Sequence, residues 1–114
     1  MTKTEQEAVP ESFVAGLKAD RFEDYRVIPI AENYDSGWHM ADWHGRFLVL
    51  SGRVELDFGD GKFSYGGGES YEVPANIRHR EAFGAAGGSL VIARRSAGSP
   101  LPSLSASAGA VSLS

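Results

Sequence analysis

The sequence predicts an all-β fold in which many short strands pair in antiparallel order. From Tyr25 to Arg95, short runs rich in β-branched and aromatic residues follow one another, and Gly, Asp and Asn stand between them. Such spacing is typical of a sandwich or a barrel. The chain has 114 residues, of which 42% are hydrophobic and 11% aromatic. That is enough for one core, and therefore for one domain.

Residues 1–24 predict a short helical arm in front of the strands. Pro10 suits the first turn of a helix, where its missing N–H would have no partner in any case. Phe13, Val14 and Leu17 would share one face of a helix of one or two turns. We expect this arm to lie outside the core.

Seven segments are the predicted strands of a body spanning residues 25–95. Two of them form a hairpin from Val54 to Tyr65, because apolar and polar residues alternate on both sides of Gly59-Asp60-Gly61. The two glycines supply the positive φ values that a tight turn requires. The strands are expected at Tyr25–Ile30, Arg46–Leu50, Arg53–Phe58, Lys62–Tyr65, Ser70–Val73, Arg78–Phe83 and Ser89–Arg95.

Residues 96–114 differ in composition from the body. They hold seven serines and two prolines, and they carry no charged side chain. They show neither strand alternation nor helical periodicity, which predicts a disordered or loosely attached tail. The lack of charge leaves open a second interpretation, in which apolar side chains dock on the body, namely Leu101, Leu104, Val111 and Leu113.

Charge and composition exclude several classes of function. The net charge is -4 and no block of basic residues occurs, so neither nucleic acid nor a membrane surface is an expected partner. No window approaches the roughly 18 apolar residues of a membrane span. Glu5 and Glu7 stand where a secretory signal would be basic and then apolar. The absence of cysteine excludes disulfides and thiolate zinc sites. We expect a cytoplasmic protein that binds a small molecule.

All three histidines lie in two short segments that flank the predicted hairpin. His39 and His44 precede it, and His79 follows it. Imidazole is the best transition-metal ligand that a chain without cysteine offers. Two strand-rich segments joined by a hairpin would bring these rings together inside a small barrel.

Four parts of the body form one pattern: Phe47–Leu56, the Gly-Asp-Gly hairpin, Gly68–Pro74 and His79. In this pattern the chain resembles the small single-domain cupins. In that family two sequence motifs, separated by a hairpin of variable length, supply strands of a double-stranded β-helix, or jelly-roll barrel. The resemblance implies a cupin barrel for residues 25–95, and a weaker similarity extends to the DHCW-motif cupins.

Both cupin motifs depart from the family pattern. In the second motif, Asn76 stands at a glycine position, and asparagine tolerates the left-handed backbone conformation better than most residues. Phe83 replaces the final asparagine of the motif. In the first, one histidine and the glutamate of the family's ligand set are missing. His39 keeps a ligand position, and His44 approaches the glutamate position if Gly45 forms a bulge.

The resemblance implies a divalent transition metal, such as Fe, Zn, Ni or Mn, held by His39, His44 and His79. Asp42 is a spare ligand. The alternative is a metal-free pocket lined by His39 and His79, with His44 facing solvent.

Other side chains near the motifs are candidates for the pocket. If His79 points inward, strand alternation makes Glu81 its inward neighbour, where a carboxyl group would act as general acid or base. The alternative is that Glu81 lies near the rim of the barrel, where its side chain is exposed to solvent. Glu81 and Tyr71 are the candidate catalytic residues. Aromatic rings suited to packing an organic ligand are Tyr34, Trp38 and Trp43.

The predicted function is that of a metal-dependent enzyme acting on a small oxygenated metabolite, of the dioxygenase, isomerase or lyase type. The incomplete ligand set keeps a second interpretation open, a non-enzymatic module that binds a small ligand or regulates. A third is a structural dimerisation unit with a filled interior. Exposed strand edges, such as the one before Gly37, favour a homodimer.

Overall fold

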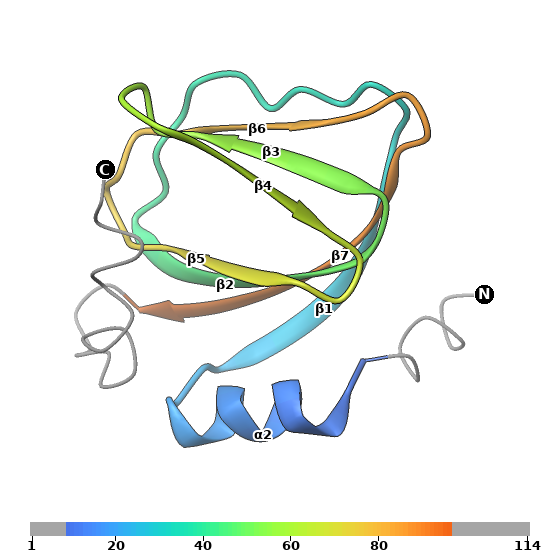
Figure 1. Ribbon diagram of the computed structural model, residues 1–114. Coiled ribbons are helices and arrows are strands. Elements are labelled where there is room, and N and C mark those ends of the chain that lie inside the picture. Colours follow the sequence, from blue (N-terminus) through green and yellow to red (C-terminus); the bar gives the residue numbers. More distant parts are fainter. Residues whose placement is uncertain (1–8, 97–114) are drawn as a thin grey trace.

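A computed structural model describes residues 9–96 of the chain (Figure 1). Within these residues the fold is mainly β, and the seven predicted strands are confirmed, although β2 begins earlier than predicted and β6 later. The predicted tail, residues 97–114, lies outside the described residues. In chain order the elements are α2 (Glu11–Ala19), β1 (Asp24–Ile30), β2 (Trp43–Ser51), β3 (Arg53–Asp57), β4 (Lys62–Gly66), β5 (Ser70–Val73), β6 (Arg80–Phe83) and β7 (Gly88–Ser96).

The strands form two antiparallel sheets that face each other (Figure 1). The larger sheet has the order β1-β7-β2-β5, and the smaller has the order β4-β3-β6. The chain passes from one sheet to the other and back, as in a jelly roll. The predicted hairpin is the β3–β4 pair. Its alternation is also confirmed, since Val54 and Leu56 are buried while Arg53 and Glu55 are exposed.

The main core lies between the two sheets, where the inward side chains of both interdigitate. At its centre the Tyr71 ring stacks between two others, with centroids 4.8 Å from Phe47 and 4.9 Å from Tyr65. The buried members of this core are Phe47, Val49, Val54, Leu56, Tyr71, Val73, Phe83 and Leu90.

Helix α2 covers the outer face of the larger sheet, outside the core between the two sheets. The helix begins directly after Pro10, whose extended backbone forms its N-terminal cap. Leu17 is buried, and the apolar face that the sequence predicted packs on the sheet. Phe13 and Val14 lie against a second cluster of buried residues, formed by Val9, Val27, Leu48 and Val91.

A buried arginine joins this helix to the sheet. Arg46 Nη2 lies 2.7 Å from Asp20 Oδ2, and Arg46 Nη1 donates to the Gly16 carbonyl at 3.3 Å. Its Nε atom donates to Glu72 on the neighbouring strand β5. The guanidinium also lies over the Phe22 ring, 4.7 Å from the centroid. One cation therefore ties the end of α2 to two strands.

Between β1 and β2 the chain runs as an irregular segment, residues 31–42, along the outer edge of β6 (Figure 1). Isolated bridges join Asp35 to Ala82 and His39 to His79. This segment and β6 carry the side chains of the candidate site. Among the described residues, no helix has the length and apolar character needed to cross a lipid bilayer.

Candidate metal centre

Backbone pairing brings His39 and His79 together. Each donates its N–H to the carbonyl of the other, both at 2.9 Å. Residues directly opposite in an antiparallel pair extend their side chains to the same side of the sheet. The two imidazole centroids are accordingly 4.3 Å apart. Just before His79, Asn76 adopts the left-handed conformation, with φ 64°, that its place in the second motif predicted.

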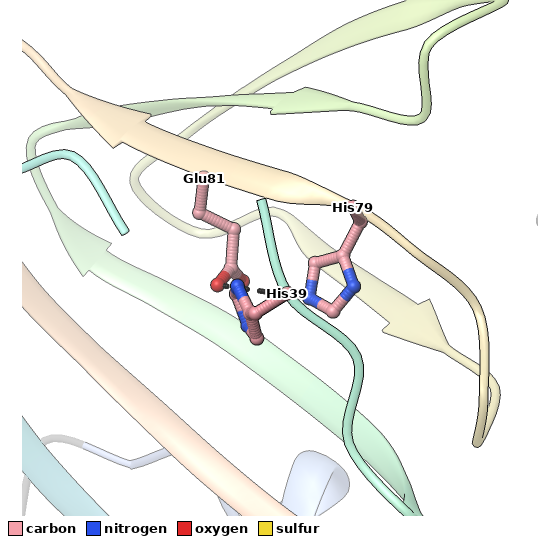
Figure 2. Close-up of side chains that lie close together, drawn as sticks. All are labelled: His39, His79 and Glu81. Atoms are coloured by element: carbon pink, nitrogen blue, oxygen red, sulfur yellow. Dashed lines mark ion pairs between the residues drawn. The ribbon is translucent and has the colours of Figure 1, made fainter. Parts of the chain in front are cut away.

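Glu81 is the third member of this cluster. It follows His79 by two residues, so alternation places both side chains on one face. Figure 2 shows the three side chains directed toward one another, and His79 Nε2 lies 3.9 Å from Glu81 Oε1. One potential ligand atom from each of His39, His79 and Glu81 falls within 4.8 Å of the others. His79 is buried, and Glu81 is half-buried.

Both imidazoles are oriented by backbone carbonyls. His39 Nδ1 lies 3.0 Å from the Gly37 oxygen, and His79 Nδ1 lies 2.9 Å from the Ile77 oxygen. A carbonyl only accepts, so Nδ1 carries the proton in each bond. In the neutral ring Nε2 is then left as a lone-pair donor, which is the form that a metal requires.

Tyr71 holds the carboxylate of Glu81 in place. Its hydroxyl donates to Glu81 Oε2 at 2.9 Å, which leaves Oε1 directed at His79. Burial, followed by the charge of Glu81 and its hydrogen bond, raises the pKa of Tyr71 well above 10.0. The phenol therefore remains protonated, and it acts as a hydrogen-bond donor to the carboxylate.

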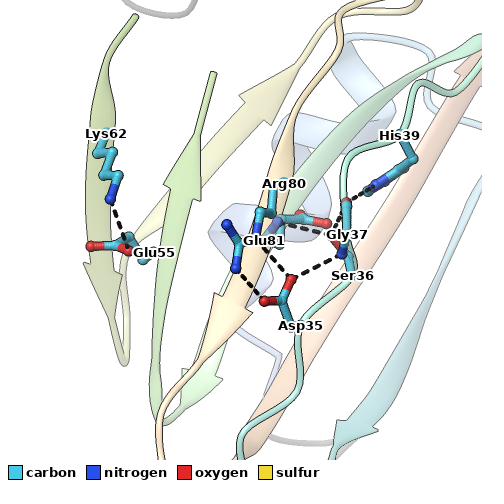
Figure 3. A network of polar contacts seen from close by, with 8 residues as sticks. All are labelled: Asp35, Ser36, Gly37, His39, Glu55, Lys62, Arg80 and Glu81. Carbon is cyan, nitrogen blue, oxygen red and sulfur yellow. Dashed lines mark hydrogen bonds and ion pairs between the residues drawn. The ribbon is translucent and has the colours of Figure 1, made fainter. Parts of the chain in front are cut away.

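The segment that carries His39 is fastened to β6 by polar contacts (Figure 3). Ser36 N–H donates to the Glu81 carbonyl, and Ser36 Oγ accepts from the Glu81 N–H, both at 2.9 Å. Arg80 donates two hydrogen bonds to Asp35, from Nε to Oδ1 at 2.9 Å and from Nη2 to Oδ2. The hydrogen bond from Arg80 lowers the pKa of Asp35 from 3.8 to about 2. These contacts fix the position of His39 relative to β6.

The cluster forms one wall of a pocket of about 190 Å³. This is below the roughly 300–1,000 Å³ of sites for drug-sized ligands, so the pocket suits a small metabolite. Its polar groups are two imidazoles and a carboxylate, and the rest of the lining is mostly apolar. The lining residues are His39, Ala41, Trp43, Phe47, Val73, Pro74, His79, Glu81 and Ile92.

Only one of the three aromatic side chains expected in the pocket lines it. Trp43 lies in the lining, on the inner face of β2. Tyr34 and Trp38 lie outside it and are 42% and 38% exposed. They belong to the irregular segment, where strand alternation does not apply. The guanidinium carbon of Arg78 lies 4.6 Å from the Trp38 ring centroid.

The structure does not bring His44 to the cluster. The bulge expected at Gly45 is absent, because β2 pairs with β5 and β7 in continuous register there. Alternation then directs Trp43 and Phe47 to the pocket and His44 to the opposite face. His44 Nδ1 accepts the N–H of Ala75 at 3.1 Å. Glu81, which the sequence analysis nominated as a general acid or base, is the third potential metal ligand beside His39 and His79.

Asp42, which the sequence analysis named as a spare ligand, is exposed and lies outside the three-residue cluster.

The sequence analysis did not nominate several of the residues that line the pocket. Phe47, Val73 and Ile92 line the pocket but were not nominated. The signal that would have found them is alternation from Trp43, since Phe47 follows it at a spacing of four on the same face and pairs with Ile92.

Comparison with known proteins identifies similar solved structures. No family model matches the chain, and no curated protein matches it. A cupin-2 domain protein from Shewanella frigidimarina is 18% identical with a TM-score of 0.54, over 79% of this chain and 98% of that one. An RmlC-like cupin from the same organism is 17% identical with a TM-score of 0.56, over 61% and 62%.

A third similar structure is an enzyme. The polyketide cyclase RemF from Streptomyces resistomycificus is 19% identical with a TM-score of 0.53, over 61% of this chain and 53% of that one. This chain thus spans less than two thirds of the RmlC-like cupin and of the cyclase. At this level of identity the likeness describes the fold alone.

Proposed function

On the premise that the chain has the cupin fold, we propose that it binds a divalent transition metal through His39, His79 and Glu81 and acts on a small oxygenated metabolite. The observation that carries this proposal is the convergence of three ligand atoms within 4.8 Å at the wall of a mostly apolar pocket. Fe, Zn, Ni and Mn all accept such a set of two nitrogens and one oxygen.

The donor set fits a metal ion. Two donors on one ion are at most about 4 Å apart, twice a bond of roughly 2.1 Å, and His79 Nε2 and Glu81 Oε1 are already 3.9 Å apart. The carbonyls behind both imidazoles and the phenol behind the carboxylate are the outer partners that orient metal ligands. All three donor atoms lie within 4.8 Å of one another, and binding an ion would draw them closer.

The protein's own contribution is to place and shield a polar substrate group. When bound, the ion would polarise a substrate oxygen or activate a water molecule. Phe47, Val73 and Ile92 limit the access of water, which strengthens electrostatic interactions inside the pocket. Tyr71 keeps Glu81 oriented, and three protein donors leave positions open for the substrate.

A second candidate function is that of a metal-free binding module. It is favoured by the contact of His79 with Glu81, which forms an ion pair when the imidazole is protonated. The polar cluster would then be satisfied without a cation and would hydrogen-bond a ligand directly. Binding that a chelator leaves unchanged, without turnover, would support this alternative.

Elemental mass spectrometry of untagged protein tests the metal. We expect about one transition metal per chain in the wild type, and loss of the metal in His39→Ala, His79→Ala and Glu81→Gln. His44→Ala is the matched control, because its imidazole lies on the other face of β2. Adding the metal should also raise the melting temperature, since a ligand that binds only the folded state stabilises it.

Two results would change the proposal. Wild-type protein that is metal-free, and that also refuses added Zn, Fe, Ni and Mn, would exclude the metal and favour the binding module. Loss of the metal in His44→Ala as well would show that the ligand set extends beyond the three residues named.

A further inference from the structure

A second cavity adjoins the metal pocket on the same face of the larger sheet. It has a volume of about 180 Å³. Trp43 and Ile92 line both cavities, so the two cavities meet at these side chains. The other residues of the second cavity are Asp24, Arg26, Ile28 and Arg94. The cluster of potential metal ligands and the pair of arginines therefore line adjoining cavities that share two apolar side chains.

Strand register places these arginines on the pocket side. Ile92 pairs with Phe47 on β2 and with Arg26 on β1, and Arg94 follows Ile92 by two residues. Alternation therefore directs Ile92 and Arg94 to the same face as Phe47 and Trp43. Arg26 reaches this face from the neighbouring strand.

The guanidinium of Arg94 lies near the Trp43 ring, and Arg94 and Arg26 are both exposed. The central carbon of the Arg94 guanidinium lies 5.7 Å from the Trp43 ring centroid. Across residues 9–96, no carboxylate forms an ion pair with Arg94 or Arg26, although Asp24 is the direct cross-strand neighbour of Arg94. A guanidinium held over an aromatic face keeps its N–H edges available, and their fork matches the two oxygens of a carboxylate.

We propose that Arg94, assisted by Arg26, binds the carboxylate of a substrate whose oxygenated end lies among His39, His79 and Glu81. This inference rests on the proposed function and narrows it to one substrate class, a small carboxylic acid with a second carbonyl or hydroxyl group. The apolar part of such an acid would lie against Trp43 and Ile92, which line both cavities. Two arginines and Asp24 leave one net positive charge on the second cavity, which suits a monoanion better than a phosphate dianion.

Isothermal titration calorimetry with a matched pair of probes tests this subsite. The probes are 4-oxopentanoate and its methyl ester, which share the ketone and differ in the carboxylate. We expect the wild type to bind the acid about tenfold or more tightly than the ester, as a charge-assisted bidentate contact should provide. Arg94→Gln should abolish that preference without changing the metal content.

Arg78→Gln is the matched control. The Arg78 guanidinium also stacks on a tryptophan, Trp38, but it lines neither cavity. This variant should keep the preference for the acid. Equal affinities of the wild type for acid and ester, a preference that survives Arg94→Gln, or binding of neither probe at millimolar concentration would each overturn the subsite.

Repeating the titrations in chelator separates this inference from the proposed function. We expect the preference for the acid to persist without metal, because the arginines require none. A preference that disappears with the chelator would mean that the carboxylate binds the cation, and it would overturn the role of Arg94. A preference that persists in protein which never binds metal would uphold the carboxylate subsite and refute the metal.

Discussion

At the scale of single residues, the orientation of the metal donors is set by very local contacts. Each imidazole bonds the carbonyl two residues before it, Gly37 for His39 and Ile77 for His79. A ring fixed in this way presents Nε2 in one direction only. Glu81 differs, because the group that orients it, the Tyr71 hydroxyl, comes from the other sheet.

Tyr71→Phe should reduce the loss of stability at high pH. Burial raises the pKa of Tyr71 in the folded protein well above the value of 10.0 expected when unfolded. A pKa raised by folding stabilises the protein fully below about pH 10, and this stabilisation is lost as the pH rises toward the folded pKa. Between about pH 9.5 and 11, the free energy of unfolding in urea should therefore fall more steeply in the wild type than in Tyr71→Phe.

Tyr34→Phe provides the comparison for this experiment. Tyr34 is 42% exposed, so its removal should leave the steep fall unchanged. Identical slopes in the wild type and Tyr71→Phe would show that Tyr71 ionises as an ordinary tyrosine and that its burial does not raise its pKa.

At the scale of elements, two segments outside the strand pairs are attached by polar side chains. Arg80 and Asp35 fasten residues 31–42 to β6, and Arg46 fastens α2 to the larger sheet. The two attachments differ in burial. The Arg80–Asp35 pair is more than 40% exposed on each side, whereas the Arg46 side chain is 11% exposed. Because water screens exposed pairs, the buried contact should contribute more to stability.

Arg46→Met should destabilise the fold by about 3 kcal/mol, since removing one partner of a buried ion pair leaves the other charge uncompensated. Methionine keeps most of the apolar volume, so the loss reports the charge contacts to Asp20 and Glu72. Urea denaturation measures it. Arg53→Met is the control, because Arg53 is exposed and bonds only Ser64 among the described side chains. A loss below about 1 kcal/mol would mean that apolar packing alone holds α2.

At the scale of the whole molecule, the candidate site exists only because the barrel closes. The smaller sheet supplies His79 and Glu81 through β6 and its extension, and the larger sheet supplies Trp43, Phe47 and Ile92. The pairing of β2 with β7 in the larger sheet also brings two turns into contact, β2–β3 and β6–β7. A Cβ atom on Gly52 would lie 2.1 Å from the Gly87 carbonyl oxygen. The two turns therefore contact each other backbone to backbone, with no room for a side chain between them.

Gly52→Ala should therefore cost about 2 kcal/mol or more beyond Gly59→Ala. Both glycines have a positive φ, 86° and 96°, so alanine meets a similar conformational strain at each. Only Gly52 adds a clash with another turn, since a Cβ on Gly59 meets no atom within 4 Å. Urea denaturation of both variants isolates the clash. Equal losses would show that the two turns separate without cost.

The strands, the hairpin and the left-handed turn at Asn76 could be predicted from the sequence alone, because alternation and turn chemistry are local properties. Resemblance to the cupins, together with the rarity of histidine, singled out His39 and His79. Which side chain joins these two histidines depends on how the strands pair in three dimensions. His44 faces away because the register runs through Gly45 without a bulge, and Glu81 takes its place. Residues 31–42 lie on β6 through pairings distant in sequence, and local periodicity carries no information about such partners.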